Sequence, residues 1–167
     1  MTEAAALQIG SAQASDEPFL REMLLEAAFP PGEPRPRGDP ILDDPRLRRY
    51  MEDWGRKGDA GVIATVDGIA VGAAWYRRFT ADKPGYGFVR TDIPEVGMAI
   101  VAPSRGRGIG RALIEALIQR ARDDRIPALS LSVSAANRPA FALYRSVGFR
   151  SVGGDEQHPT MLLRLAE

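Results

Sequence analysis

The feature that most constrains the fold is a strand–helix–strand pattern between Glu95 and Ser134. The apolar run EVGMAIV is followed by the glycine-rich stretch APSRGRG, then by a helical pattern from Ile109 to Arg122, and then by ALSLSVS. Two strands joined through a helix are expected to lie parallel in one sheet, because the helix carries the chain back to the end at which the first strand began.

The remaining apolar segments predict antiparallel neighbours for this pair. Residues 61–66 and 69–79 flank Asp67 and Gly68, a dipeptide typical of hairpin turns. Other strands are expected at residues 7–12, 149–153 and 161–165, and other helices at residues 16–28, 44–54 and 138–147. The expected order is β-α-α-β-β-β-α-β-α-β-β, which describes an α/β chain whose central mixed, mostly antiparallel sheet is flanked by helices. Its 167 residues suit a single domain over residues 1–167.

Composition excludes several kinds of chemistry. The formal net charge is zero, so the sequence predicts no general attraction to nucleic acid or to an anionic membrane. The chain has no cysteine, which excludes disulfides, thiolate nucleophiles and zinc–thiolate sites, and we expect no metal. The first 16 residues lack a basic region followed by a long apolar run, and no stretch reaches the ~20 apolar residues of a membrane span. We therefore expect a cytoplasmic location without a signal peptide.

The stretch RGRGIGR alternates arginine and glycine where a helix is expected to begin. The first N–H groups of a helix lack intrahelical partners and carry partial positive charge, so they attract anions. Glycines permit close approach to these groups, and guanidinium forks suit phosphate oxygens. We therefore expect a phosphate or pyrophosphate here, although a glycine-rich turn with exposed arginines is an alternative. The residues concerned are Arg105, Gly106, Arg107, Gly108, Ile109, Gly110 and Arg111.

Two common phosphate motifs do not fit this stretch. A P-loop needs Lys and then Ser or Thr after its last glycine, but Gly110 is followed by Arg111 and Ala112. The dinucleotide pattern G-x-G-x-x-G would need glycine in place of Arg111. The pattern that remains is R-x-x-G-x-G, formed by Arg105, Gly108 and Gly110.

That pattern, with the strand before it, the helix after it and the downstream block NRPAFALYRSVGF, resembles the GNAT family of N-acetyltransferases. The resemblance covers about residues 95–149. It implies an enzyme, an acyltransferase that moves an acetyl group from acetyl-CoA directly to an amine in a ternary complex. The absence of cysteine agrees, since no thiol is present to carry the acetyl group.

The resemblance also implies roles for individual residues. The loop backbone would hold the coenzyme A pyrophosphate, the backbone of Ile100 and Val101 would pair with the pantetheine arm, and Asn137 would touch that arm. Tyr144 would contact the cofactor and protonate the departing thiolate. Glu95 would accept the amine proton directly or through water, while a backbone N–H near Val101 would meet the oxyanion.

Several of these residues have plainer interpretations. Tyr144 is also expected to pack with Phe141 and Val147. Glu95 at a strand start can be merely solvated, and Asn137 can be only a helix cap. For the acceptor, the resemblance points to the N-terminal helices, their loop, one central strand and the final hairpin. The substrate-binding candidates are Phe29, Trp75 and Tyr76, of which the last two also suit core packing.

Two other functional classes stay open. A non-catalytic acyl-CoA-binding module would keep the glycine loop but make no use of Tyr144 and Glu95. A serine hydrolase would use Ser104, Asp123 or Asp124, and His158, which follow the chain order of that fold. Against the hydrolase, Ala102 stands where its nucleophile turn needs glycine.

The acceptor amine is not identified by the sequence. Small amines, amino acids, antibiotics and protein N-termini all fit. The segment Phe29 to Pro40 has five prolines and two glycines, so it predicts a loop rather than a regular element. Homodimers are common in the GNAT family, and the resemblance allows one here.

Overall fold

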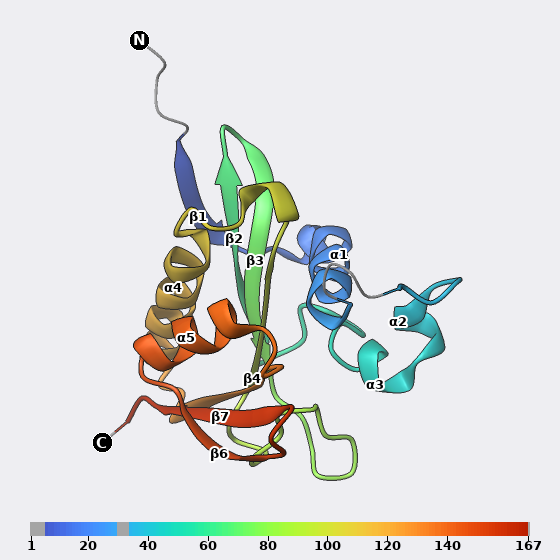
Figure 1. Cartoon of the computed structure of the whole chain (residues 1–167), viewed down its shortest axis with the longest axis vertical. Coiled ribbons are helices and arrows are strands. Elements are labelled where there is room, and N and C mark those ends of the chain that lie inside the picture. The colour runs from blue at the N-terminus through green and yellow to red at the C-terminus, as the bar shows by residue number, and fades with distance from the viewer. Residues whose placement is uncertain (1–5, 30–33, 167) are drawn as a thin grey trace. The chain divides into compact units, whose positions relative to one another are not determined.

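The computed structural model describes residues 6–29 and 34–166 (Figure 1). Its strands are β1 (Leu7–Ser11), β2 (Ala60–Val66), β3 (Ile69–Arg77), β4 (Glu95–Ile100), β5 (Ala128–Ser132), β6 (Arg150–Gly154) and β7 (Pro159–Arg164). Its α-helices are α1 (Glu17–Ala28), α2 (Pro40–Asp43), α3 (Pro45–Arg48), α4 (Ile109–Asp123) and α5 (Arg138–Ser146). Two 3-10 turns, η1 (Ala14–Asp16) and η2 (Ala102–Ser104), precede α1 and α4.

The strands form a seven-stranded mixed sheet in the order β1-β2-β3-β4-β5-β7-β6. β1 pairs antiparallel with β2, β5 with β7, and β6 with β7. β4 and β5 are parallel, with Glu95 opposite Ser130. The predicted parallel pair and the mixed α/β fold class, a sheet flanked by helices, are therefore confirmed.

The chain forms two compact units, each made of two separate stretches. Unit 1 contains Met1–Trp75 and Gly97–Leu117, and unit 2 contains Tyr76–Val96 and Ile118–Glu167. The strands β3 and β4 and the helix α4 each contribute residues to both units. That residues 1–167 act as one domain stays a prediction.

The region after the first long helix differs from the sequence prediction. One helix was expected to be capped by Asp43 or Asp44 and to run through Trp54. In that range the structure has only the four-residue α3, which ends at Arg48 and is followed by turns, and a second four-residue helix, α2, lies before it. Pro45 has no N–H to donate and disfavours helical geometry in the residue before it, so Asp44 takes an extended conformation and becomes the cap of α3. The Asp44 carboxylate accepts from the N–H of Arg46 at 2.9 Å.

Unit 1 buries one face of α1 and one face of the first half of α4, formed by Ile109, Leu113, Ile114 and Leu117. The buried residues of α1 are Leu20, Met23 and Leu24. Helical spacing predicts an apolar stripe of Phe19, Met23, Leu24 and Ala27. In the structure Phe19 is half-buried and Ala27 is exposed, so the stripe is displaced toward Leu20. In β4, Gly97 lies against the Trp75 indole, where an added Cβ would stand 2.5 Å from Cζ2. A side chain larger than hydrogen would displace Trp75 from the core.

Unit 2 encloses β5 on both faces. Leu129, Ser130 and Leu131 are all buried, which explains why this strand shows no polar face. The loop between β3 and β4 comes close to it, since a Cβ on Gly87 would stand 2.5 Å from the backbone carbon of Leu131. Glycine at position 87 therefore allows the loop to lie directly on the strand. Among the described residues, no helix has the length and apolar character needed to cross a membrane.

Candidate cofactor loop and catalytic residues

The loop that opens α4 belongs to unit 1 and has left-handed backbone at two glycines. The φ angles of Gly106 and Gly108 are 75° and 80°, a region that residues with a Cβ enter only with strain. No heavy atom lies within 4 Å of the position a Cβ would take at either residue. The two glycines are therefore needed for the course of the chain, and the space beside them is open to a ligand.

The helix itself begins without a side-chain cap, because Gly108 precedes its first residue and has no side chain. The first bond that reaches back from α4 joins Ala112 N to Gly108 O at 3.2 Å. The N–H groups of Ile109 and Gly110 come before this bond, at the positive end of the helix dipole. Ile109 is only 3% exposed, so its side chain anchors the loop while its backbone remains at the helix start. This arrangement suits a bound anion.

The three arginines of the loop differ in their surroundings. The Arg105 Nε donates to the carbonyl of Ile100 at 2.9 Å, and its Nη2 pairs with Glu26 at 3.3 Å. Arg111 pairs with Glu115, one turn along α4, at 3.5 Å. Arg107 is exposed on the loop. The guanidinium of Arg105 thus holds protein groups, and its contact with a phosphate stays a prediction.

The end of β4 limits which backbone groups can meet a pantetheine arm or an oxyanion. The N–H of Val101 donates to Val71 O at 2.9 Å, and the Val101 carbonyl accepts from Ser104 N at 3.0 Å. Both backbone groups of Val101 are therefore already used, which weakens its predicted contact with the arm. Backbone groups alternate in direction along a strand, so those of Ile100 and Met98 point away from the side that meets β3. Ile100 remains a candidate, and Met98, which the sequence analysis did not name, joins it.

Glu95 lies in unit 2 at the start of β4 and is 3% exposed. Its Oε1 accepts the N–H of Gly87 at 2.9 Å. The alternative that this carboxylate is merely solvated is wrong, because the β3–β4 loop covers it. Its role as the base stays a prediction.

Tyr144 is the one buried residue of α5. Its ring meets the ring of Phe149 edge to face, with centroids 5.7 Å apart. Burial raises the pKa of the Tyr144 phenol above its usual value of 10.0, so the hydroxyl keeps its proton across the neutral range. The structure thus shows a packing role for the ring, while the predicted role of the hydroxyl as an acid stays a prediction.

Asn137 caps α5, as the sequence analysis allowed. Its Oδ1 accepts from the N–H of Ala140 at 3.4 Å, and the side chain is exposed. Contact with the cofactor arm stays a prediction.

The three predicted acceptor-binding residues have different environments. Trp75 and Tyr76 are 0% and 1% exposed, which agrees with core packing. The Tyr76 hydroxyl donates to Asp124 Oδ2 at 2.9 Å and so fastens β3 to the end of α4. Phe29 is half-buried directly after α1. Acceptor contact by any of them stays a prediction, and Pro30 to Glu33, in the predicted loop, lie outside the described residues.

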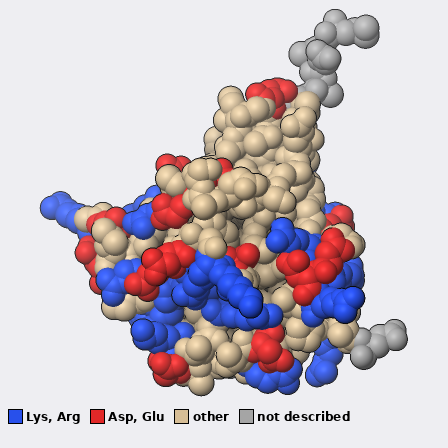
Figure 2. All heavy atoms as spheres, turned by 180° about the vertical axis from the view of Figure 1, so that it is seen from behind, with Lys and Arg blue, Asp and Glu red and all other residues tan. Residues whose placement is uncertain are grey.

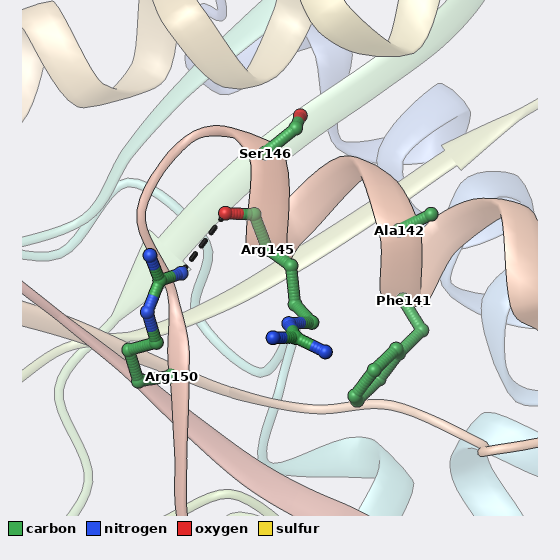
Figure 3. Close-up of a pocket in the computed structure, with 5 residues that line it drawn as sticks. All are labelled: Phe141, Ala142, Arg145, Ser146 and Arg150. Atoms are coloured by element: carbon green, nitrogen blue, oxygen red, sulfur yellow. Dashed lines mark hydrogen bonds between the residues drawn. The ribbon is translucent and has the colours of Figure 1, made fainter.

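Two hollows were not predicted from the sequence. One, in unit 2, has a volume of about 440 Å³ and is lined by Phe141, Ala142, Arg145, Ser146 and Arg150 (Figure 3). Arg145 lies over the Phe141 ring at 5.9 Å, and Arg150 donates to the Arg145 carbonyl at 3.0 Å. The spacing of Phe141 and Arg145, one helical turn apart, was the available signal.

The other hollow, in unit 1, has a volume of about 480 Å³ and runs along α1. Its lining comes from α1 and from the start of α2, namely Glu17, Pro18, Arg21, Glu22, Leu25, Gly38, Asp39, Pro40 and Ile41. Arg21 pairs with Glu17 at 3.4 Å and with Asp39 at 3.1 Å. Figure 2 shows positive and negative side chains interspersed on the face it displays, as the zero net charge suggests.

The hydrolase alternative gains no support from unit 2. His158 lies 3.9 Å from Asp155, whose Oδ1 also accepts the backbone N–H of His158. The carboxylate of Asp124 instead accepts from Tyr76 and from Arg120, the latter at 2.8 Å. The histidine is thus beside a different carboxylate from the two that the hydrolase interpretation requires.

Comparison with known proteins identifies the class. The acetyltransferase (GNAT) family model matches residues 20–149. The chain therefore belongs to the GNAT acetyltransferase family, and the resemblance drawn from the glycine loop and the block after it is confirmed.

Individual relatives and structures show how far this likeness extends. A mycothiol acetyltransferase of Acidothermus cellulolyticus is 35% identical over 114 residues, which are 65% of this chain and 35% of that protein. The chain thus spans about a third of the length of this relative. An L-2,4-diaminobutyric acid acetyltransferase of Nocardia farcinica is 28% identical over 88% of this chain and 95% of its own.

Among solved structures, a ribosomal-protein-alanine N-acetyltransferase of Brucella melitensis has a TM-score of 0.71 at 25% identity, covering 95% of this chain and 99% of its own. The yncA protein of Salmonella typhimurium, solved with its cofactor acetyl-CoA, has a TM-score of 0.72 at 20% identity, covering 97% of this chain and 95% of its own. At that identity the second likeness shows the fold alone.

Proposed function

We propose that this chain is an acetyl-CoA-dependent N-acetyltransferase that acts as a single domain on a primary amine. The observation that carries the proposal is the start of α4, where two left-handed glycines, an uncapped helix end and open space coincide. Backbone N–H groups there suit the pyrophosphate of coenzyme A, and the family model covers this loop. The residues assigned to the cofactor are Ile100, Arg107, Gly108, Ile109, Gly110, Arg111 and Asn137, with Met98 added; Arg105 and Gly106 shape the loop.

Proton transfer falls to Glu95 and Tyr144 in this proposal. A free alkyl amine has a pKa near ~10.4, so at neutral pH it must lose a proton before it can attack a thioester. Glu95 accepts that proton directly or through one water, and the Ile100 N–H stabilises the developing oxyanion. As the carbon–sulfur bond breaks, the Tyr144 hydroxyl donates its proton to the leaving sulfur. The phenol is protonated at neutral pH and can therefore donate, although burial raises its pKa and so makes it a weaker acid than a solvated tyrosine.

The acceptor class is proposed from the relative that matches most of the chain. The diaminobutyric acid acetyltransferase aligns with 88% of this chain, so small amino acids with a side-chain amine lead the acceptor panel. Peptides with a free N-terminal amine come next, because the Brucella structure is named for an alanine of a ribosomal protein. The hollow along α1 is lined by three carboxylates and one arginine, an excess of negative charge that suits the amine of an acceptor.

The test is an assay of thiol release with acetyl-CoA and this panel. Thiol release that depends on an amine, with an acetylated product found by mass spectrometry, is the expected result. Binding of acetyl-CoA without release in the presence of any panel amine would favour the acyl-CoA-binding module. Hydrolysis of simple esters without an amine would favour the hydrolase.

A further inference from the structure

The last turn of α1 carries a carboxylate that contacts two arginines from distant parts of the chain. Glu26 Oε2 lies 3.3 Å from Arg105 Nη2, and the other carboxylate oxygen accepts from Arg35 Nη2. The Glu26 side chain is 25% exposed, less than either arginine. Glu26 is therefore the centre of a three-residue cluster in unit 1, formed with Arg35 and Arg105.

Arg105 connects this cluster to the end of β4. Its Nε donates to the carbonyl of Ile100 at 2.9 Å, while its Nη2 meets Glu26. One planar guanidinium can hold a carbonyl and a carboxylate at once because its donors are fixed in a fork. The peptide at which β4 ends and the glycine loop begins is thus held from the side by a charged group.

We propose that Glu26 is a positioning residue for the acetyl-CoA loop. Its carboxylate keeps the Arg105 guanidinium on the Ile100 carbonyl, and this contact fixes the course of the chain into the glycines. The inference rests on the proposed function of the loop as the acetyl-CoA site. Glu26 itself does not touch the cofactor in this account, since Arg105 lies between it and the loop backbone.

The sign of the change in acetyl-CoA affinity distinguishes a positioning role of Glu26 from competition with the phosphate for Arg105. If Glu26 positions Arg105, removing its charge loosens the loop and weakens acetyl-CoA binding. If Glu26 merely competes with phosphate for Arg105, removing its charge frees the guanidinium and strengthens binding. Glu26→Gln keeps the side-chain shape and removes only the charge, so it distinguishes the two cases.

The experiment is titration calorimetry with acetyl-CoA on the whole chain, using Glu26→Gln, Arg105→Lys and the double variant. Each single variant should weaken binding about three- to tenfold, the range expected for a partly exposed charged hydrogen bond. The double variant should be no weaker than either single one, because both changes remove the same interaction. In the amine assay, KM for acetyl-CoA should rise while kcat stays near the wild-type value, a split that a general loss of stability would not produce.

Arg35→Gln is the matched control, since it removes the other partner of the same carboxylate. Its acetyl-CoA affinity should stay close to wild type. Unchanged or tighter binding by Glu26→Gln, additive losses in the double variant, or an equal loss in Arg35→Gln would each overturn the inference. Should Glu26→Gln fail to fold, wild-type affinity in Arg105→Lys overturns it alone. Failure of the wild-type chain to bind acetyl-CoA would instead overturn the proposed function.

Discussion

The helix starts of this chain differ in what meets their first N–H groups. The helix α1 continues directly from η1 without a side-chain cap, but it has the acidic residue Glu17 in its first turn. The helices α2, α3 and α5 follow Asp39, Asp44 and Asn137, whose side chains accept the first N–H groups. The helix α4 follows Gly108, which has no side chain to offer, and its first turn contains no acidic residue. A carboxylate there would satisfy the helix but would also place negative charge where an anion is expected. The difference indicates that the start of α4 is reserved for a ligand.

An uncapped start costs about 1 kcal/mol of helix stability, which α4 offsets by burial. Leu113, Ile114 and Leu117 are all 0% exposed, and each fully buried side chain contributes about 1.5–3 kcal/mol. The short helices α2 and α3 have one buried residue each. A long buried helix can therefore leave its end open, and a short surface helix depends on its cap.

The largest expected effect follows from placing a carboxylate just before α4, as Asp39 and Asp44 stand just before α2 and α3. Gly108→Asp would put a negative charge at the helix start on left-handed backbone, so acetyl-CoA affinity should fall about a hundredfold or more. Titration calorimetry measures the loss. A folded variant that binds like wild type would refute the assignment of this helix start.

Gly68→Asp is the control for the backbone strain in that variant. Gly68 has φ 82°, is exposed in the β2–β3 hairpin turn and has no heavy atom within 4 Å of a Cβ. The variant Gly68→Asp therefore introduces the same negative charge at a left-handed position, but outside α4 and its loop. It should lower the melting temperature about as much as Gly108→Asp does and leave acetyl-CoA binding unchanged.

The next effect is expected in α5, which is proposed to contribute the buried side chain of Tyr144 to the reaction, whereas α4 contributes its N-terminus. Tyr144→Phe keeps the ring against Phe149 and removes the hydroxyl, so turnover should fall ~10²-fold while acetyl-CoA affinity stays near wild type. Because burial raises the pKa of this phenol, its ionisation should add no limb to the pH–rate profile between about pH 6 and 9. If Tyr144→Phe turns over at the wild-type rate under conditions where the chemical step is rate-limiting, the role of Tyr144 is packing and not proton donation.

Tyr76→Phe provides the contrast within unit 2. The Tyr76 hydroxyl is bound to the Asp124 carboxylate, so its removal should cost about 1.5–3 kcal/mol of unfolding free energy. Denaturant unfolding of the two variants should therefore show the larger loss for Tyr76→Phe, and the turnover assay the larger loss for Tyr144→Phe.

A third, smaller effect is expected at Glu95, a buried carboxylate of unit 2. Glu95→Gln keeps a hydrogen-bond acceptor for Gly87 N–H but cannot take a proton, so turnover should fall about tenfold or more. The acidic limb of the pH–rate profile should disappear with it. A profile that keeps its wild-type limb would assign that limb to another group, with Asp92 the next to test.

The smallest effect concerns the cap of α5. Asn137→Ala removes a long, exposed hydrogen bond of 3.4 Å, so the unfolding free energy should drop by about 0.5–1 kcal/mol. If Asn137 also touches the cofactor arm, acetyl-CoA affinity falls as well. A lower melting temperature with unchanged affinity would show that Asn137 acts only as a helix cap.

Local patterns predicted most of the fold, because periodicity and turn residues act over a few positions. They predicted the strand–helix–strand segment and the glycine loop correctly. They missed the end of α3 at Arg48, since the apolar spacing of Leu47, Tyr50 and Met51 continues past it. They also could not tell that Glu95 is covered, because the covering glycine lies in an irregular loop.

The contacts of Arg105 were out of reach for a different reason. Its carboxylate partner is 79 positions away in the sequence, on another helix. No local sequence pattern relates Glu26 to Arg105, so their contact is known only from the folded structure.

The way the chain alternates between its two units affects how the protein can evolve by recombination. It crosses from one unit to the other after Trp75, Val96 and Leu117, and these crossings lie inside β3, β4 and α4 rather than in linkers. Recombination that exchanged either unit as a whole would therefore need several crossovers, each inside a strand or a helix.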